Sequence, residues 1–501
     1  MLPQPEDPDQ YVCVSPALVL EVDGSRPVLY PLDVEDSHLF VLRPVDGFAL
    51  SLLDGRRRVS DARAMFSTLF PDEPDGAFDD IVRRVDETVR SSLRTRGRPA
   101  RGILESSSRP IPDAVAHDPR DFVVDAREFA AQMADVRTRY RLSRPIHILT
   151  VFTHHCFTNC VYCYAERPRV DEMPLERWEE LLDEMVDLGI RQVSPDNGDV
   201  PARPDGLRFL EMLVRKGFNF LLSTKAPFTE QDVRRLLDAG FAEPLRGRVH
   251  RGVQLSIDAV DDDVCARLLG TSRPQTARHR RTFQAFAGMG VTPRIKTVVT
   301  GLNADQILPL VRTYHDLGAR RFSFVRYERS FYRHRDDLDV TADLLDGIRS
   351  QFDAVRSDFP DVDLEETVTS RSAATGAADE ESRRRAWRDR AGCGGGWSRL
   401  GIAADGSAFL CEQMVLDEPY IVGDARVQSL REIWDGERLL DFIHPRREQF
   451  QETPCRDCAE FEECMWLQGR CYRDAFFAHG SVYHPPPLCP NTRLSDPVPV
   501  T

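Results

Sequence analysis

The sequence predicts an α/β protein whose central part is a parallel sheet with crossover helices, preceded by a small strand-and-helix unit and followed by a cysteine-rich segment. Three observations lead to this prediction. Between about residues 146 and 326 short apolar runs alternate with amphipathic stretches, which is the rhythm of parallel strands joined by helices. Residues 11–95 contain shorter apolar runs, and seven of the twelve cysteines lie after residue 390.

Composition limits the classes of function. The 501 residues carry a net charge of -15, which disfavours nonspecific binding to nucleic acid or anionic lipid. No stretch approaches the roughly 18 apolar residues of a membrane span, and the first residues lack the features of a signal peptide. We therefore expect a cytoplasmic protein with reduced cysteines and with neither nucleic acid nor membrane as a partner.

The unit at residues 11–95 begins with apolar runs and continues with helical segments. Asp54-Gly55 is a turn signal, and Ser60 is placed to cap the helix after it. The expected strands are 11–22, 27–32 and 38–44, and the expected helices are 49–53, 61–70 and 78–93.

The run from Phe48 to Ala62 contains an apolar helix, an Asp-Gly break and a capped second helix. It resembles the RiPP recognition element, a winged-helix-like domain that binds the leader peptides of ribosomally made precursors. The resemblance implies that a leader peptide is bound as an added strand at a sheet edge. The alternative is an ordinary small domain.

Residues 96–122 are rich in Arg, Ser and Pro and are expected to form a linker. A helix is expected at 124–140. The alternating series then follows, with strands at 146–152, 192–194, 219–223, 252–257, 292–299 and 321–326, and helices at 175–188, 207–216, 230–239, 276–289 and 304–317.

Three cysteines follow the first strand of this series, Cys156, Cys160 and Cys163. Their spacing lets them ligate three irons of a [4Fe-4S] cube and leaves the fourth iron open. Zinc would favour a fourth nearby ligand and paired Cys-x-x-Cys units, and a disulfide scaffold belongs to small secreted domains. The pattern therefore favours a cluster.

The spacing, with Tyr162 directly before the last cysteine, resembles the signature of the radical S-adenosylmethionine (SAM) enzymes. That resemblance implies a partial (β/α)6 barrel, here residues 123–335, with active-site groups at the carboxyl ends of the strands, as in barrels generally. It also implies that SAM binds the open iron and that an electron from the cluster cleaves it to a 5′-deoxyadenosyl radical. The cofactor then carries the hard chemistry.

Strand ends supply the other residues implied to bind SAM. Asn197-Gly198-Asp199 stands where the family has Gly-Gly-Glu-Pro, so the carboxylate is kept and the first glycine is lost; a plain polar turn is the alternative. Lys225 follows a predicted strand. A lysine at such a place can pair with an acid, and the alternative is that it lies on the surface. The remaining expected SAM contacts are Thr224, Ser256, Asp258 and Lys296.

The seven late cysteines resemble a SPASM domain, which we place at residues 391–495, after a connecting helix and linker at 336–390. Asp405-Gly406 independently predicts a hairpin turn. The resemblance implies an inner cluster on Cys393, Cys411 and Cys471 and an outer cluster on Cys455, Cys458, Cys464 and Cys489. The Cys464-to-Cys471 spacing is longer than usual, and the inner set has three ligands, so an open iron is one hypothesis. Zinc is the alternative for the outer set.

Glu412 follows Cys411, near the place where similar formylglycine-forming maturases have an acidic residue that serves as a base, and the resemblance makes it the candidate catalytic base. A carboxylate buried beside a negative cluster should also have a raised pKa. A salt bridge is its alternative role. The leading prediction is a radical SAM/SPASM maturase that uses three [4Fe-4S] clusters to crosslink a precursor peptide by a thioether or carbon–carbon bond, with flavodoxin or ferredoxin as reductant. Alternatives are oxidation or epimerisation of a peptide or protein side chain, as in formylglycine maturases, and, more remotely, a nonenzymatic metal-binding protein.

Overall fold

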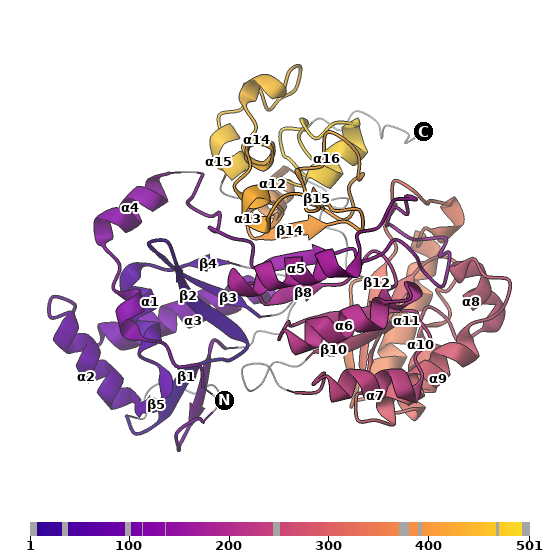
Figure 1. The fold of residues 1–501 in the computed structure, drawn as a ribbon, viewed down its shortest axis with the longest axis horizontal. Helices are drawn as coiled ribbons and strands as arrows, with labels where there is room; N and C mark the ends of the chain where they lie inside the picture. The colour runs from indigo at the N-terminus through magenta and orange to yellow at the C-terminus, as the bar shows by residue number, and fades with distance from the viewer. Residues whose placement is uncertain are drawn as a thin grey trace. The chain divides into compact units, whose positions relative to one another are not determined.

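The computed structural model (Figure 1) describes residues 8–32, 39–95, 102–112, 114–135, 137–243, 251–369, 380–388, 393–466 and 470–492. The chain forms two compact units. The first ends at Pro145, and the second comprises Ile146–Glu243 and Arg251–Thr501. None of the described helices combines the length and apolar character needed to cross a membrane.

The first unit contains two three-stranded antiparallel sheets and four helices. One sheet has the order β5-β1-β6 and the other β2-β3-β4. Buried side chains from both sheets and from the helices form one core. The elements are β1 (Tyr11–Val14), β2 (Leu18–Asp23), β3 (Arg26–Pro31), β4 (Phe40–Val41), α1 (Pro44–Ser51), β5 (Asp54–Arg58), α2 (Val59–Leu69), α3 (Ala77–Thr95), β6 (Leu104–Ser107) and α4 (Ala126–Ala134).

Three expectations for this unit were wrong in detail. The apolar run 11–22 is two strands in different sheets, because the chain turns between Ser15 and Leu18. The expected linker 96–122 includes β6, which pairs with β1 despite its polar sequence. The expected helix 124–140 is α4, which is capped by Asp125 and ends at Ala134.

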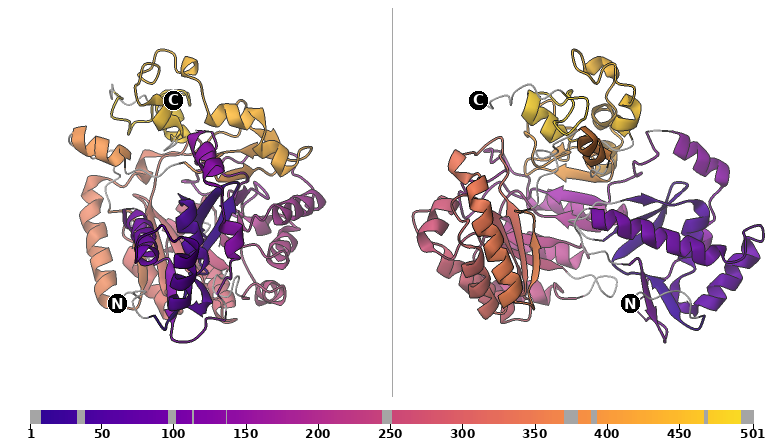
Figure 2. Two further views of the ribbon diagram at one scale, coloured as in Figure 1. Left: turned by 90° about the vertical axis from the view of Figure 1, so that its left-hand side faces the viewer. Right: turned by 180° about the vertical axis from the view of Figure 1, so that it is seen from behind.

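The second unit is built around parallel strands with helices on their outer side (Figure 2). Strands β7 and β8 pair in parallel, as do β9 to β12, and an isolated bridge between Gln192 and Asn219 links the two groups. These six strands are the expected partial barrel. They are β7 (His147–Thr150), β8 (Gln192–Ser194), β9 (Leu221–Thr224), β10 (Gly252–Ser256), β11 (Arg294–Val299) and β12 (Arg321–Arg326).

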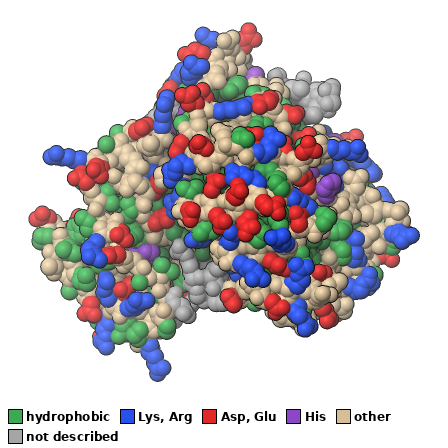
Figure 3. All heavy atoms as spheres, viewed as in Figure 1, with side chains coloured by type: hydrophobic (Ala, Val, Ile, Leu, Met, Phe, Trp, Pro, Cys, Tyr) green, Lys and Arg blue, Asp and Glu red, His purple; other side chains and the backbone are tan. Residues whose placement is uncertain are grey.

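The covering helices show why the sequence forms this layer. Helix α5 buries an apolar stripe that includes Trp178 and Met185 and exposes Glu176, Glu180 and Asp183. Acidic side chains accordingly gather over α5 at the surface (Figure 3). The helices are α5 (Leu175–Asp187), α6 (Gly206–Arg215), α7 (Glu230–Asp238), α8 (Asp262–Leu269), α9 (Thr276–Ala287), α10 (Ile307–Asp316) and α11 (Ala342–Asp358); α8 was not expected.

Both ends of the barrel are extended by strands from later in the chain. Strand β13 (Asp363–Glu366) pairs with β12, and β14 (Arg399–Ile402) pairs in parallel with β7. The expected hairpin joins β14 to β15 (Ser407–Phe409), with Gly406 at φ 93°. The cysteine-rich part thus shares a sheet with the barrel. It continues with β16 (Gly423–Asp424), α13 (Leu430–Trp434), α14 (Glu437–Ile443), α15 (Phe461–Trp466) and α16 (Tyr472–His479).

The connecting helix and linker expected at 336–390 contain, besides α11, a helix in their polar end, α12 (Glu380–Arg388). Glutamate and arginine have good helix propensity, so a polar composition does not by itself predict a loop. Residues 370–379 and 389–390 lie outside the described part of the chain.

Candidate active site

The loop after β7 brings Cys156, Cys160 and Cys163 into one environment. Cys160 is buried and the other two are half-buried. Burial, with smaller contributions from Cys163 and Cys160, raises the pKa of Cys156 to about 12, whereas Arg167 lowers it. Thiols held in this way become ligands when a metal displaces their protons. The donor set therefore fits an iron-sulfur cluster with three protein ligands.

Bonds to neighbouring elements hold this loop in place. The amides of Asn159 and Val161 donate to the carbonyls of Leu269 and Leu268 at the end of α8, each at 2.9 Å. Arg167 donates to Cys163 Sγ at 3.5 Å and to a loop carbonyl at 2.8 Å. The sequence analysis missed Arg167, although a guanidinium four residues after the last cysteine was a usable signal.

The turn after β8 lies against the cysteine loop. Asn197 has φ 66°, a left-handed conformation that asparagine tolerates better than most other residues, so it can replace the missing glycine. A Cβ on Gly198 would lie 1.7 Å from the Thr153 carbonyl oxygen, so only glycine fits there. The Asp199 amide donates to the His155 carbonyl at 2.8 Å.

Two buried polar groups at this turn bear on its fit to SAM. Asn197 Oδ1 is buried and has no hydrogen-bond partner among the described residues. The buried Asp199 carboxylate accepts hydrogen bonds from the Thr224 hydroxyl and, at 3.3 Å, from the Lys225 amide. Burial outweighs these bonds and raises the pKa of Asp199 to about 6. An acceptor without a donor, beside a carboxylate, fits the amino group that SAM presents.

Asp258 is occupied by groups of the chain itself. Its Oδ2 accepts hydrogen bonds from the Lys225 ammonium at 2.9 Å and from the Tyr162 hydroxyl, and its Oδ1 accepts one from the Val298 amide at 3.1 Å. Lys225 also donates to the Ser256 carbonyl at 2.9 Å. Asp258, paired with Lys225, therefore fixes Tyr162 within the cysteine loop. Both side chains already have partners within the chain.

Lys296 lies on β11 beside Ser256 in the strand register. Its charge acts on Glu412: burial raises the pKa of Glu412, and Arg399 and Lys296 partly oppose that shift. The two cysteine regions meet at Glu166, three residues after Cys163, whose carboxylate accepts hydrogen bonds from the Leu416 amide at 3.2 Å and from the Tyr332 hydroxyl at 2.8 Å. Glu412, next to Cys411, thus lies in the segment that contacts the first cysteine loop.

The late cysteines lie in two places. Cys393 and Cys411 pack against one buried cluster, and Cys455, Cys458 and Cys464 belong to another. Cys393 contributes to the raised pKa of Cys411 and of Cys471. Burial, together with the charges of Cys458, Cys464 and Cys489, raises the pKa of Cys455 to about 12. These sulfur donors fit clusters of the kind expected.

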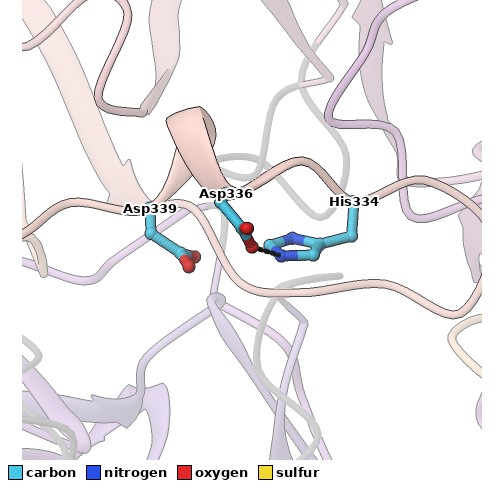
Figure 4. A group of neighbouring side chains, drawn as sticks. All are labelled: His334, Asp336 and Asp339. Atoms are coloured by element: carbon cyan, nitrogen blue, oxygen red, sulfur yellow. Dashed lines mark hydrogen bonds and ion pairs between the residues drawn. The ribbon is translucent and has the colours of Figure 1, made fainter. Parts of the chain in front are cut away.

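A separate cluster of ligand-type side chains lies after β12 (Figure 4). His334, Asp336 and Asp339 place one potential donor atom each within 4.8 Å of one another. Arg329 already pairs with both carboxylates, at 3.5 Å and 3.0 Å, and Asp336 is almost fully exposed. The group is a solvated ion-pair network.

Comparisons with known proteins agree with these sites. Residues 150–317 match the radical SAM superfamily, and residues 393–459 match SPASM, described as an iron-sulfur cluster-binding domain. The PqqA peptide cyclase of Granulibacter bethesdensis is 24% identical over 354 residues, which cover 69% of this chain and 87% of that protein. The PqqA peptide cyclase of Gluconobacter oxydans is 24% identical over 355 residues, covering 69% and 91%.

Two solved structures share the fold over nearly the whole chain. Streptococcus suis SuiB bound to S-adenosylmethionine is 17% identical with a TM-score of 0.62, and SuiB bound to its precursor peptide SuiA is 16% identical with a TM-score of 0.61. Each covers 95% of this chain and 98% of the SuiB chain. With both family matches falling on the cysteine groups of one barrel-based unit, the chain is a radical SAM enzyme that carries a SPASM iron-sulfur cluster-binding domain after its barrel.

Proposed function

We propose that this enzyme is a maturase that crosslinks a ribosomally made precursor peptide, by a thioether or a carbon–carbon bond. The observation that carries the proposal is the contact of the segment after Cys411, which includes Glu412, with the first cysteine loop: the Leu416 amide donates to the Glu166 carboxylate, three residues after Cys163, at 3.2 Å. A peptide substrate is supported by the relatives, which are named as peptide cyclases, and by SuiB, which was solved with a precursor peptide.

Different residues of the chain have different proposed roles in this reaction. Cys156, Cys160 and Cys163 would hold one cluster, and Asn197 and Asp199 would hold the amino group of SAM. When bound, the cluster and SAM together supply the oxidising power that removes a hydrogen atom from a carbon of the substrate. Tyr162, held by its hydrogen bond to Asp258, anchors the cysteine loop to the end of β10.

A crosslink removes two hydrogens from the peptide. One leaves as an atom, and the other leaves as a proton and an electron. Glu412 is placed to accept the proton, since a buried carboxylate with a raised pKa is a competent base. Two clusters on the inner and outer cysteine groups would provide the electron acceptor, which brings the proposed total to three [4Fe-4S] clusters.

The first unit is proposed to bind the leader peptide. Its sheets have open edges at β2, β4, β5 and β6, and an extended peptide can add to such an edge through backbone hydrogen bonds. Binding there would raise the local concentration of the core peptide at the barrel. Flavodoxin or ferredoxin is the proposed reductant.

The experiment incubates the anaerobic, reduced enzyme with SAM and the precursor encoded beside its gene, and follows 5′-deoxyadenosine and the peptide mass. We expect 5′-deoxyadenosine release and a peptide lighter by two hydrogens. A modified peptide of unchanged mass would instead indicate epimerisation, and release without any peptide change would argue against this substrate.

Glu412 is tested separately. Glu412→Gln should still release 5′-deoxyadenosine but form about a hundredfold less crosslink, given the usual contribution of a general base. The control is Glu437→Gln, a surface carboxylate on α14, which should behave as the unmodified enzyme does. Full crosslinking by Glu412→Gln would remove the base from the mechanism.

A further inference from the structure

Among the described residues three arginines are almost completely buried, and two of them show how this protein satisfies such a group. Arg251 donates from Nε, Nη1 and Nη2 to three backbone carbonyls at 2.8 to 3.1 Å. Arg26 pairs with Asp23 and donates to carbonyls at the end of the first unit, and only its Nε has no partner among the described residues. In both cases protein oxygens accept hydrogen bonds from both terminal nitrogens of the guanidinium.

Arg470 is the exception. It is 2% exposed, and its Nε, Nη1 and Nη2 have no hydrogen-bond partner among the described residues. A buried cation without acceptors is among the least favourable arrangements in a protein. The group that satisfies Arg470 is therefore expected to come from outside the polypeptide.

The surroundings of Arg470 show where such a group would lie. The rings of Phe450, Tyr472 and Tyr483 stand 4.9, 4.7 and 5.7 Å from its guanidinium carbon. Aromatic faces stabilise a cation but do not accept the hydrogens along the edge of the fork. The rings thus hold the guanidinium in place but leave the N–H groups along its edge without an acceptor among the described residues.

The two cysteine groups lie beside this guanidinium. Arg470 precedes Cys471 in the chain, and the rings around it pack against both groups. Tyr472 and Tyr483 belong to one cluster with Cys393 and Cys411, and Phe450 and Tyr483 belong to another with Cys455, Cys458 and Cys464. The charge of Arg470 accordingly lowers the pKa of Cys393 and of Cys455. A single cation is therefore shared by both groups, and it occupies the spacing between Cys464 and Cys471 that is longer than usual.

We propose that Arg470 is the common counter-ion of the two auxiliary iron-sulfur clusters and donates hydrogen bonds to their sulfur atoms. A cluster with thiolate ligands gains one negative charge on reduction, and a fixed cation stabilises that reduced state. Net charge, hydrogen bonds to sulfur and burial are the properties that set cluster potentials, and Arg470 acts through all three. Its consequence is a raised reduction potential at both auxiliary sites, which favours uptake of the electron left by substrate oxidation.

The inference rests on the proposed function only in assigning the two cysteine groups to clusters. The test uses the full chain with Cys156→Ala, Cys160→Ala and Cys163→Ala, so that any cluster present is an auxiliary one. In this background, anaerobically reconstituted Arg470→Met and Arg470→Lys are compared for iron content and for potential by redox titration with electron paramagnetic resonance. Arg431→Met, which removes an exposed charge from α13, is the control matched for net charge.

We expect Arg470→Met to keep its iron while the ratio of reduced to oxidised auxiliary cluster, at the midpoint of the background protein, falls about tenfold or more. For a one-electron couple that ratio corresponds to about 59 mV. Arg470→Lys should retain most of the potential, because it keeps the charge, and Arg431→Met should retain all of it.

Iron-loaded Arg470→Met with an unchanged potential would overturn the proposal. Loss of iron from both Arg470 variants would also overturn it, since it would indicate a packing role. Loss of iron from Arg470→Met alone would support it, because the lysine variant would show that the charge holds the clusters. A background protein that binds no iron would instead refute the cluster assignment, which is a distinct result.

Discussion

Replacing Gly198 with alanine tests whether the turn after β8 must press against the cysteine loop. The added Cβ would lie 1.7 Å from the Thr153 carbonyl oxygen and 2.8 Å from its carbon. Real Cβ contacts essentially never fall below 3.0 Å, and both of these Thr153 atoms belong to the backbone, so the two segments must separate by more than about 1 Å. A displacement of this size at a reacting site costs about a hundredfold.

We expect Gly198→Ala to keep its iron, because its cysteines are intact, but to bind SAM about a hundredfold more weakly. The bond from the Asp199 amide to the His155 carbonyl is the first contact that this separation would break. Equilibrium SAM binding and 5′-deoxyadenosine release, each normalised to iron content, measure the effect.

The control is Gly347→Ala in α11, where an added Cβ meets nothing within 4 Å. This variant should bind SAM normally and gain up to about 1 kcal/mol of stability from alanine's helix propensity. SAM affinity of Gly198→Ala within twofold of the unmodified enzyme would refute the steric reasoning.

Three further predictions follow from the same site. Asn197→Gly should weaken SAM binding by one hydrogen bond, about 2- to 12-fold, and Asn197→Ala should weaken it further, because alanine adds about 1–2 kcal/mol of left-handed strain; equal losses would argue against the backbone role of Asn197. Lys225→Met leaves the buried Asp258 carboxylate without its cation and should lower the free energy of unfolding by about 3–5 kcal/mol, measured by denaturant titration; a smaller loss than in a surface lysine variant would contradict it. Burial lowers the pKa of His279 from 6.5 to about 3, so the unfolded state binds the extra proton, and stability should fall by about 1.4 kcal/mol per unit as pH drops below about 6.5. His279→Leu should flatten that slope in thermal unfolding at several pH values, and an unchanged slope would exclude His279 as its source.

Local patterns were sufficient for the elements whose formation depends on near neighbours. The three cysteines of the first loop, the six barrel strands and the Asp405-Gly406 hairpin were all predicted. Helix α8 was missed, although Asp261 caps it and Gly270 ends it, because an eight-residue helix beside a strand carries a weak periodic signal. Strand β6 was missed because its polar residues pair with β1 at a sheet edge, where packing does not require apolar side chains.

In the candidate site, too, features that depend on near neighbours in the sequence were predicted and features that depend on distant residues were not. The three loop cysteines could be named from their spacing, and Asn197 and Gly198 from the family resemblance, but the partners of buried charges could not be predicted. The pairing of Lys225 with Asp258 depends on β9 and β10 lying side by side in register. The isolation of Arg470 depends on rings from three separate segments of the chain.

By itself, the sequence determined the chemistry that this protein carries, because ligand spacing along a loop is a local property. Only the tertiary structure decided how the parts are joined, since the parallel pairing of β14 with β7 joins residues some 250 positions apart and depends on burial of both strands. That pairing joins to the barrel sheet the hairpin that leads into Glu412. A carboxylate acquires its role from the groups around it, and those groups are set by the fold.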